Sequence, residues 1–141
     1  MIRTFRPQDL DALLSLWLAG NLDAHPFIPV EYWKGQADAV RELLPQAELL
    51  VYDSGAGPAG FLGLDGSYIA GIFVDRAARS QGIGRALLDA AKQRRDVLTL
   101  HVYRDNPRAA AFYRREGFAC CGEQADAQTG APELLFRWAR G

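Results

Sequence analysis

The spacing of hydrophobic positions predicts a strand and two helices in the first third of the chain. Residues 2–6 alternate between polar and apolar as a short strand does, and leucines at helical spacing follow them. The pair Gly20-Asn21 is predicted to end this first helix. After a loop that contains two prolines, residues 30–44 favour a second helix, which Pro45 closes.

The middle of the chain predicts three antiparallel strands. Residues 48–52 and 59–64 are strongly apolar, and the turn-forming segment 53–58 between them indicates a hairpin. A second turn at Asp65-Gly66 leads into a third strand over residues 67–74. Three strands joined by tight turns form one antiparallel part of a sheet.

After residue 74 the hydrophobic period changes from strand spacing to helix spacing and back. The predicted elements are a helix over 82–95, a strand over 97–103, a helix over 107–117, and strands over 118–123 and 133–138. A strand, a helix and a strand in succession indicate a crossover connection. We therefore expect an α/β (α+β) fold with a mixed, mostly antiparallel sheet of about six to seven strands and about four flanking helices.

Composition agrees with one globular domain over residues 1–141. The chain is 49% apolar and 11% aromatic, and it has no apolar run near the roughly 18 residues of a membrane span. It starts without a charged leader and long apolar stretch, so a cytoplasmic location is expected. The only cysteines, Cys120 and Cys121, are adjacent, which suits neither a structural disulfide nor a metal cluster, and we expect no metal.

Charge is unevenly distributed along the chain. The net charge is −1, which argues against a general nucleic-acid or membrane binder. Residues 76–115, however, carry ten basic side chains against three acidic ones, a local balance of +7. Both a polyanionic ligand and a solvated arginine-rich face agree with this asymmetry, so charge alone does not distinguish between them.

The segment 72–88 has the pattern of a phosphate-binding turn. A strand leads through Gly82 and Gly84 into a helix, whose first N–H groups are unpaired and whose N-terminus is partly positive. Arg79 and Arg85 flank this turn and could balance phosphate charge. A P-loop is excluded because no Gly-Lys-Ser/Thr follows, and a dinucleotide fingerprint because its third glycine is missing.

Two motifs in the right order resemble those of the GNAT superfamily of N-acetyltransferases. Residues 79–84, Arg-Ser-Gln-Gly-Ile-Gly, match its acyl-CoA-binding motif Arg/Gln-x-x-Gly-x-Gly/Ala. Residues 100–118 resemble the next strand, asparagine and helix of that family. Trp17, residues 25–28 and the pair Tyr32-Trp33 further resemble the small bacterial single-domain members.

The resemblance implies a binding site for acetyl-CoA as co-substrate. The backbone of residues 72–74 would pair with the pantetheine arm, with one N–H polarising the thioester carbonyl, and Asn106 would bond that arm or cap the next helix. The expected donor-binding residues are Ile72, Phe73, Val74, Arg79, Ser80, Gln81, Gly82, Ile83, Gly84, Arg85 and Asn106.

The resemblance also implies the catalytic residues. Tyr113 would protonate the departing thiolate; the alternative is a buried aromatic anchor for its helix. His101 replaces a glutamate of several relatives and would remove a proton from the amine; the alternative is a structural histidine. Further candidates for the base are His25, Asp23 and Glu31.

The acceptor is expected to be a primary amine of a protein lysine, a protein N-terminus or a small molecule. His25, Phe27, Tyr32 and Trp33 belong to the region that lines the acceptor side in relatives, although a loop packed by its own aromatics is an equal alternative. Neither nucleic acid nor membrane is an expected partner, and the protein could be a monomer or a homodimer. A coenzyme A-binding sensor without turnover is the alternative function.

Overall fold

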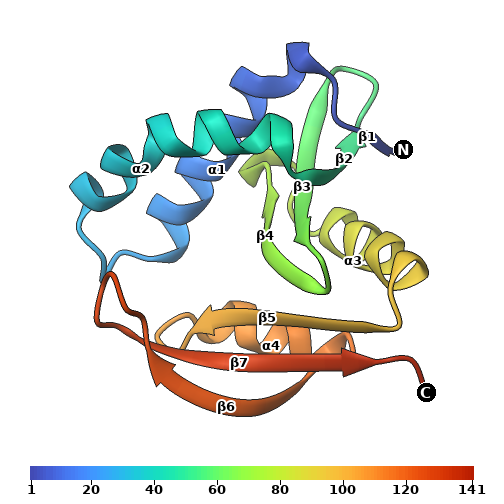
Figure 1. The fold of residues 1–141 in the computed structure, drawn as a ribbon. Coiled ribbons are helices and arrows are strands. Elements are labelled where there is room, and N and C mark those ends of the chain that lie inside the picture. Colours follow the sequence, from blue (N-terminus) through green and yellow to red (C-terminus); the bar gives the residue numbers. More distant parts are fainter.

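The computed structural model describes residues 1–141, and its central feature is a seven-stranded sheet that opens between its two middle strands (Figure 1). The strand order is β1-β2-β3-β4-β5-β7-β6, and only β4 and β5 run parallel. The strands are β1 (Ile2–Thr4), β2 (Glu48–Asp53), β3 (Pro58–Asp65), β4 (Tyr68–Val74), β5 (Val97–Tyr103), β6 (Ala119–Ala125) and β7 (Pro132–Ala139). The helices are α1 (Leu10–Ala24), α2 (Val30–Leu43), α3 (Ile83–Arg94) and α4 (Pro107–Arg115). The predicted fold class is thus confirmed.

Strands β4 and β5 touch only at their beginnings. Tyr68 and Thr99 form the single register pair, and the Thr99 N–H donates to the Ser67 carbonyl oxygen at 2.9 Å. A β-bulge lies just beyond, because Gly63 pairs with Gly71 and Leu64 with Ile69, which leaves Ala70 unpaired. Bulges bend a strand and increase its twist. Beyond the bulge β4 turns away from β5, and the two strands form a V in Figure 1.

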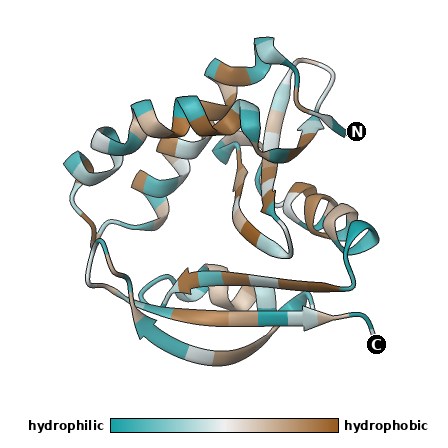
Figure 2. Cartoon of the chain, in the orientation of Figure 1, coloured by the Kyte–Doolittle hydropathy of each residue, from teal (hydrophilic) through white to brown (hydrophobic).

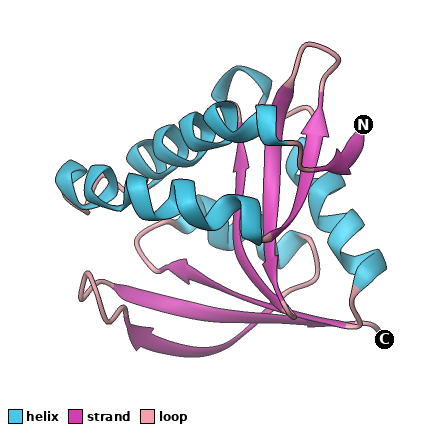
Figure 3. Ribbon diagram, turned by 45° about the horizontal axis from the view of Figure 1, so that its top comes forward, coloured by secondary structure: helices cyan, strands magenta, loops and turns pink.

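Helices cover the sheet unevenly. Helices α1 and α2 pack side by side over one face of β2–β4 (Figure 3), where their apolar side chains meet Leu49, Val51 and Phe61. Helices α3 and α4 share a second, larger core on the opposite face, and apolar residues recur along these helices and the middle strands in Figure 2. No helix of the structure has the length and hydrophobicity that a membrane crossing requires.

The predicted end of the first helix is wrong. Helix α1 continues through Gly20 to Ala24, and Asn21 is buried with its side-chain amide donating to the Trp17 carbonyl oxygen at 2.9 Å. A Cβ at Gly20 would lie 3.0 Å from the ring of Phe73 on β4. Glycine is therefore present here because it leaves room for that ring, and it does not end the helix. The other predicted helices and strands are present, with ends shifted by at most a few residues.

A buried ion pair fixes the N-terminal strand to the start of α1. Asp9 is only 4% exposed, and both of its oxygens accept hydrogen bonds from the Arg3 guanidinium, at 2.7 and 2.9 Å. The Arg6 N–H donates to the same carboxylate at 2.8 Å. The hydrogen bonds from Arg3 hold the pKa of Asp9 below its ordinary value.

We predict that Asp9→Asn lowers the free energy of unfolding by about 2 kcal/mol at pH 7, because Arg3 loses one of its two charged partners and keeps only Asp53, at 3.0 Å. Since folding lowers the pKa of Asp9, the stabilisation is complete above the unfolded-state pKa of about 3.9 and disappears as the pH falls through the lower folded-state pKa. The difference between wild type and variant should therefore be constant from about pH 5 to 7 and shrink below about pH 4.

Urea unfolding at several pH values measures this difference. Asp11→Asn is the matched control, because Asp11 is 87% exposed where it contacts Arg41 and its loss should change the unfolding free energy little. An Asp9→Asn variant as stable as the control at pH 7 contradicts the prediction.

Candidate functional site

The free edge of β4 lies in the opening of the V. The Asp75 N–H donates to the Ala59 carbonyl oxygen at 2.8 Å, and Phe73 pairs with Phe61 in the β3–β4 register. Antiparallel ladders bond every second residue, so the backbone of Phe73 points toward β3. The N–H and C=O groups of Ile72 and Val74 consequently point into the V, where β5 is too far away to pair with them. They are available to an extended ligand.

The N-terminus of α3 has the geometry of an anion-binding site. Its cap residue Gly82 has a φ of 80°, no side chain caps the helix, and no atom lies within 4 Å of the position of a Cβ at Gly82. The first intrahelical bond runs from the Ala86 N–H to the Gly82 carbonyl oxygen, so the N–H groups of residues 83–85 have no helical partner. The preceding turn is also unusual, since Ser80 has a φ of 66°. These features fit the phosphates of coenzyme A.

The two glycines of the motif differ in what the fold requires of them. Gly82 has a positive φ, which favours glycine. A Cβ at Gly84 would lie 3.4 Å from the Phe112 ring of α4, an ordinary van der Waals contact, so an alanine would also fit there.

The arginines beside this turn are paired with acids. Arg79 donates to the Asp23 carboxylate at the end of α1 at 2.7 Å, and Arg76 lies 3.5 Å from the same group. The hydrogen bond from Arg79, with the charges of Arg76 and Arg108, holds the pKa of Asp23 below its ordinary value, which disfavours Asp23 as a general base. Arg85 lies 3.7 Å from Glu116.

Helix α4 holds Asn106 and Tyr113. The Asn106 side-chain oxygen accepts the Ala109 N–H at 3.3 Å, so Asn106 caps the helix. Tyr113 is 9% exposed and packs against the rings of Phe118 and Phe136. Burial raises the pKa of Tyr113, which keeps its phenol protonated at neutral pH.

His101 lies on the other face of β5. Leu98, Leu100 and Val102 point into the core that α4 covers, whereas His101 alternates with them and is partly exposed. Its Nδ1 atom is 2.8 Å from the Tyr68 hydroxyl, and its Nε2 atom is 3.5 Å from the Gln124 side-chain nitrogen. Tyr113 and His101 therefore lie on opposite sides of the sheet.

Aromatic residues close the far side of the opening, where the α1–α2 loop meets the end of β5. The His25 ring lies 5.6 Å from those of Phe27 and Trp33 and 4.9 Å from that of Tyr103. Tyr32 contacts Trp33 and bonds Gln128 in the β6–β7 loop. The four predicted acceptor-side residues are thus together, packed on one another, and burial lowers the pKa of His25 to about 4.

Two residues of this region were missed by the sequence analysis as site residues. Tyr103 shares the face of His101 by simple alternation and could have been identified from that pattern. Tyr68 could not, because only the pairing of β4 with β5 brings it to His101.

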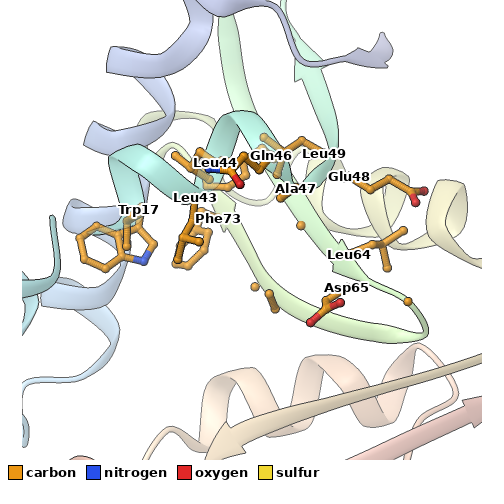
Figure 4. A pocket seen from close by; sticks show the side chains of 16 residues that line it. Trp17, Leu43, Leu44, Gln46, Ala47, Glu48, Leu49, Leu64, Asp65 and Phe73 are labelled. Carbon is orange, nitrogen blue, oxygen red and sulfur yellow. The ribbon is translucent and has the colours of Figure 1, made fainter. Parts of the chain in front are cut away.

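An apolar cavity of about 480 Å³ lies beneath the second half of α2, on the α1–α2 face of β4 (Figure 4). Its walls include Trp17, Leu43, Leu44 and Phe73, and its floor includes Ala70 and Gly71, next to the free edge of β4. The cavity therefore opens beside the V on the face opposite α3. Nothing in the sequence pattern indicated it, because its walls come from four separate segments of the chain.

Comparison with known proteins places this geometry among acetyltransferases. Residues 22–130 match the family model described as an acetyltransferase (GNAT) domain. The chain is similar to the peptidyl-lysine N-acetyltransferase YiaC of Escherichia coli K12, with 34% identity over 98% of this chain and 96% of that protein. It is also similar to peptidyl-lysine N-acetyltransferase YjaB of the same organism, with 32% identity over 98% and 95% of the two chains.

Solved structures show the same fold. The solution structure of apo-form YjaB from Escherichia coli has a TM-score of 0.88 and 30% identity, covering 100% of this chain and 98% of that chain. The PaiA N-acetyltransferase from Thermoplasma acidophilum, solved in complex with coenzyme A, has a TM-score of 0.80 over 99% of this chain and 98% of that chain. At 17% identity, this second likeness concerns the fold alone.

Proposed function

Because the chain belongs to the GNAT acetyltransferase family and is an acyltransferase, we propose that it transfers the acetyl group of acetyl-CoA to the side-chain amine of lysine in a protein or peptide. The observation that carries the proposal is the free edge of β4 beside the uncapped N-terminus of α3. The choice of lysine among amines rests on two curated relatives that match nearly the whole chain and are named peptidyl-lysine N-acetyltransferases.

The donor is held by backbone groups. The N–H and C=O groups of Ile72 and Val74 pair with the amides of the pantetheine arm, and the N–H groups of residues 82–85 hold the phosphates. Acetyl-CoA supplies the acetyl thioester, and a β4 N–H in the V donates to its carbonyl oxygen as negative charge develops there. The β3–β4 register supports this choice, because the backbone of Phe73 points toward β3 and that of Ile72 and Val74 points into the V.

Two side chains move protons on opposite faces of the sheet. A lysine ammonium, with an ordinary pKa of about 10.4, must lose a proton before it attacks, and His101 accepts that proton. As the new N–C bond forms and the C–S bond breaks, the Tyr113 hydroxyl donates its proton to the departing thiolate. Acid and base on opposite faces suit a donor and an acceptor that enter from opposite sides.

The acceptor lies on the face that α1 and α2 share with His101. The cavity next to Ala70 and Gly71 offers apolar walls for the methylene stem of a lysine or for its neighbours. His25, Phe27, Tyr32 and Trp33 form the far wall through their aromatic packing.

The test is acetylation of matched peptides. We expect thiol release from acetyl-CoA with an N-terminally blocked peptide that contains one lysine, and a mass increase of one acetyl group on that lysine. The same peptide with glutamine in place of lysine should be inert. Turnover only with a free peptide N-terminus or a small amine would contradict lysine as the acceptor while leaving acetyl transfer intact.

Asp23 is predicted to compete with the donor for the arginines. Asp23→Asn should bind coenzyme A about threefold to tenfold more tightly at low salt, since Arg76 and Arg79 lose the carboxylate that occupies them. Isothermal titration calorimetry measures the change. Asp38→Asn, an exposed aspartate on α2 without an ion pair, is the control. Weaker binding in Asp23→Asn would mean instead that Asp23 orients Arg79 for the phosphate.

Tyr113→Phe is predicted to lower kcat by about a hundredfold, because the thiolate then leaves without a proton donor. The ring remains in the core, so the melting temperature and the affinity for coenzyme A should stay near those of wild type. Steady-state kinetics with calorimetry separates these effects. A kcat within twofold of wild type would leave Tyr113 with only its packing role.

A further inference from the structure

A chain of hydrogen bonds crosses the uncovered face of the C-terminal half of the sheet and has His101 at its centre. Tyr68 of β4 contacts Nδ1 of His101 at 2.8 Å. On the other side, the Gln124 side-chain nitrogen lies 3.5 Å from Nε2 of His101 and 2.9 Å from the Glu133 carboxylate. The chain therefore joins β4, β5, β6 and β7, although β4 and β5 share only one register pair.

The carboxylate at the end of this chain determines the direction of each hydrogen bond. An ionised carboxylate only accepts, so the Gln124 atom beside Glu133 is the amide nitrogen and not the oxygen. An amide nitrogen only donates, so Nε2 of His101 accepts the second Gln124 proton. A neutral imidazole has one donor and one acceptor, which leaves Nδ1 as the donor to the Tyr68 oxygen.

We propose that Tyr68 is a positioning residue that fixes His101 in its Nδ1–H tautomer, with Gln124 and Glu133 directing the lone pair of Nε2 toward the acceptor side. The proposal rests on the role of His101 as base in the proposed function. The contact between Gln124 and Nε2 is at the long limit of a hydrogen bond and Gln124 is exposed, so an acceptor amine or its water can displace it.

Tyr68 and Glu133 stabilise the ring once it holds the extra proton, whereas the Gln124 N–H, which only donates, must leave the protonated Nε2. The hydrogen bond from Nδ1–H to Tyr68 persists. The carboxylate of Glu133, at the end of the chain of hydrogen bonds, supplies negative charge near the ring. Further charged or titratable side chains beside this face are Tyr103 on β5, Arg137 on β7 opposite Thr99, and Asp126 in the β6–β7 loop. His25 from the α1–α2 loop packs on Tyr103, with ring centroids 4.9 Å apart. Tyr68 remains a phenol at neutral pH, because burial and the charges of Glu133 and Asp126 raise its pKa.

The ring nitrogens can be observed without any turnover. The chain has two histidines, so long-range ¹⁵N–¹H spectra of wild type and His101→Asn assign the His101 signals by their loss. We expect wild-type His101 as the Nδ1–H tautomer at high pH. In Tyr68→Phe the Nε2–H tautomer should appear, because Nδ1 loses the oxygen that accepts its proton.

Kinetics give the second readout. Tyr68→Phe should lower kcat/KM for the lysine peptide about fivefold to tenfold and move the acidic limb of its pH profile to lower pH, since the protonated ring loses one hydrogen bond. Gln124→Leu, an exposed change, should mix the two tautomers. Tyr52→Phe is the control, because the Tyr52 hydroxyl on β2 is far from this chain and its loss should alter neither readout.

The outcomes separate this proposal from the proposed function. An Nε2–H tautomer in wild type, or a Tyr68→Phe variant with wild-type spectra and pH profile, overturns the positioning role. Wild-type activity in His101→Asn overturns the role of the chain in catalysis. If wild type acetylates no lysine peptide but shows the expected tautomer change, the choice of acceptor fails and the assignment of the ring protons stands.

Discussion

The site depends on two neighbouring strands that pair at one point and then separate. Backbone N–H and C=O groups inside a sheet are almost always bonded, so a strand edge left free inside the fold is costly unless something else pairs with it. The bulge at Ala70 turns β4 away from β5, and the residues after the bulge expose their backbone in the V. A ligand with regularly spaced amides would complete the sheet, so the proposed donor site follows from the strand geometry.

The same separation gives the site two sides. Helix α3 and Tyr113 lie on one face of the sheet, and His101 with the aromatic group around His25 lies on the other. Two contacts cross between the sides from the end of α1: Asp23 bonds Arg79, and His25 lies 3.4 Å from the Asn106 amide. The end of α1 thus touches both the turn before α3 and the cap of α4.

Local sequence was enough for most of the elements and for the glycine turn at the start of α3, because a helix start, a glycine conformation and strand alternation are set within a few residues. Prediction from local sequence failed where a residue far away in the chain determines the local structure or the partner of a side chain. The sequence around Gly20 predicts a helix end, yet Gly20 lies inside α1, where its missing side chain leaves room for the Phe73 ring of β4. Likewise His101 was identified as a candidate, but its partner Tyr68 is 33 residues away and becomes a neighbour only through strand pairing. The cavity under α2 has the same origin in distant segments.

The fold also changes the interpretation of the positive charge of residues 76–115. Several of its arginines face acids: Arg76 and Arg79 face Asp23, Arg85 faces Glu116, and Arg94 and Arg95 face Glu48. These three acids offset part of the excess of basic residues, so the excess by itself is weak evidence for a polyanion. The N–H groups at the start of α3 have no such partner. In the proposed donor site, backbone donors at the start of α3 would therefore provide the permanent attraction for phosphate, whereas each paired arginine would have to exchange an internal acid for the ligand before it contributes.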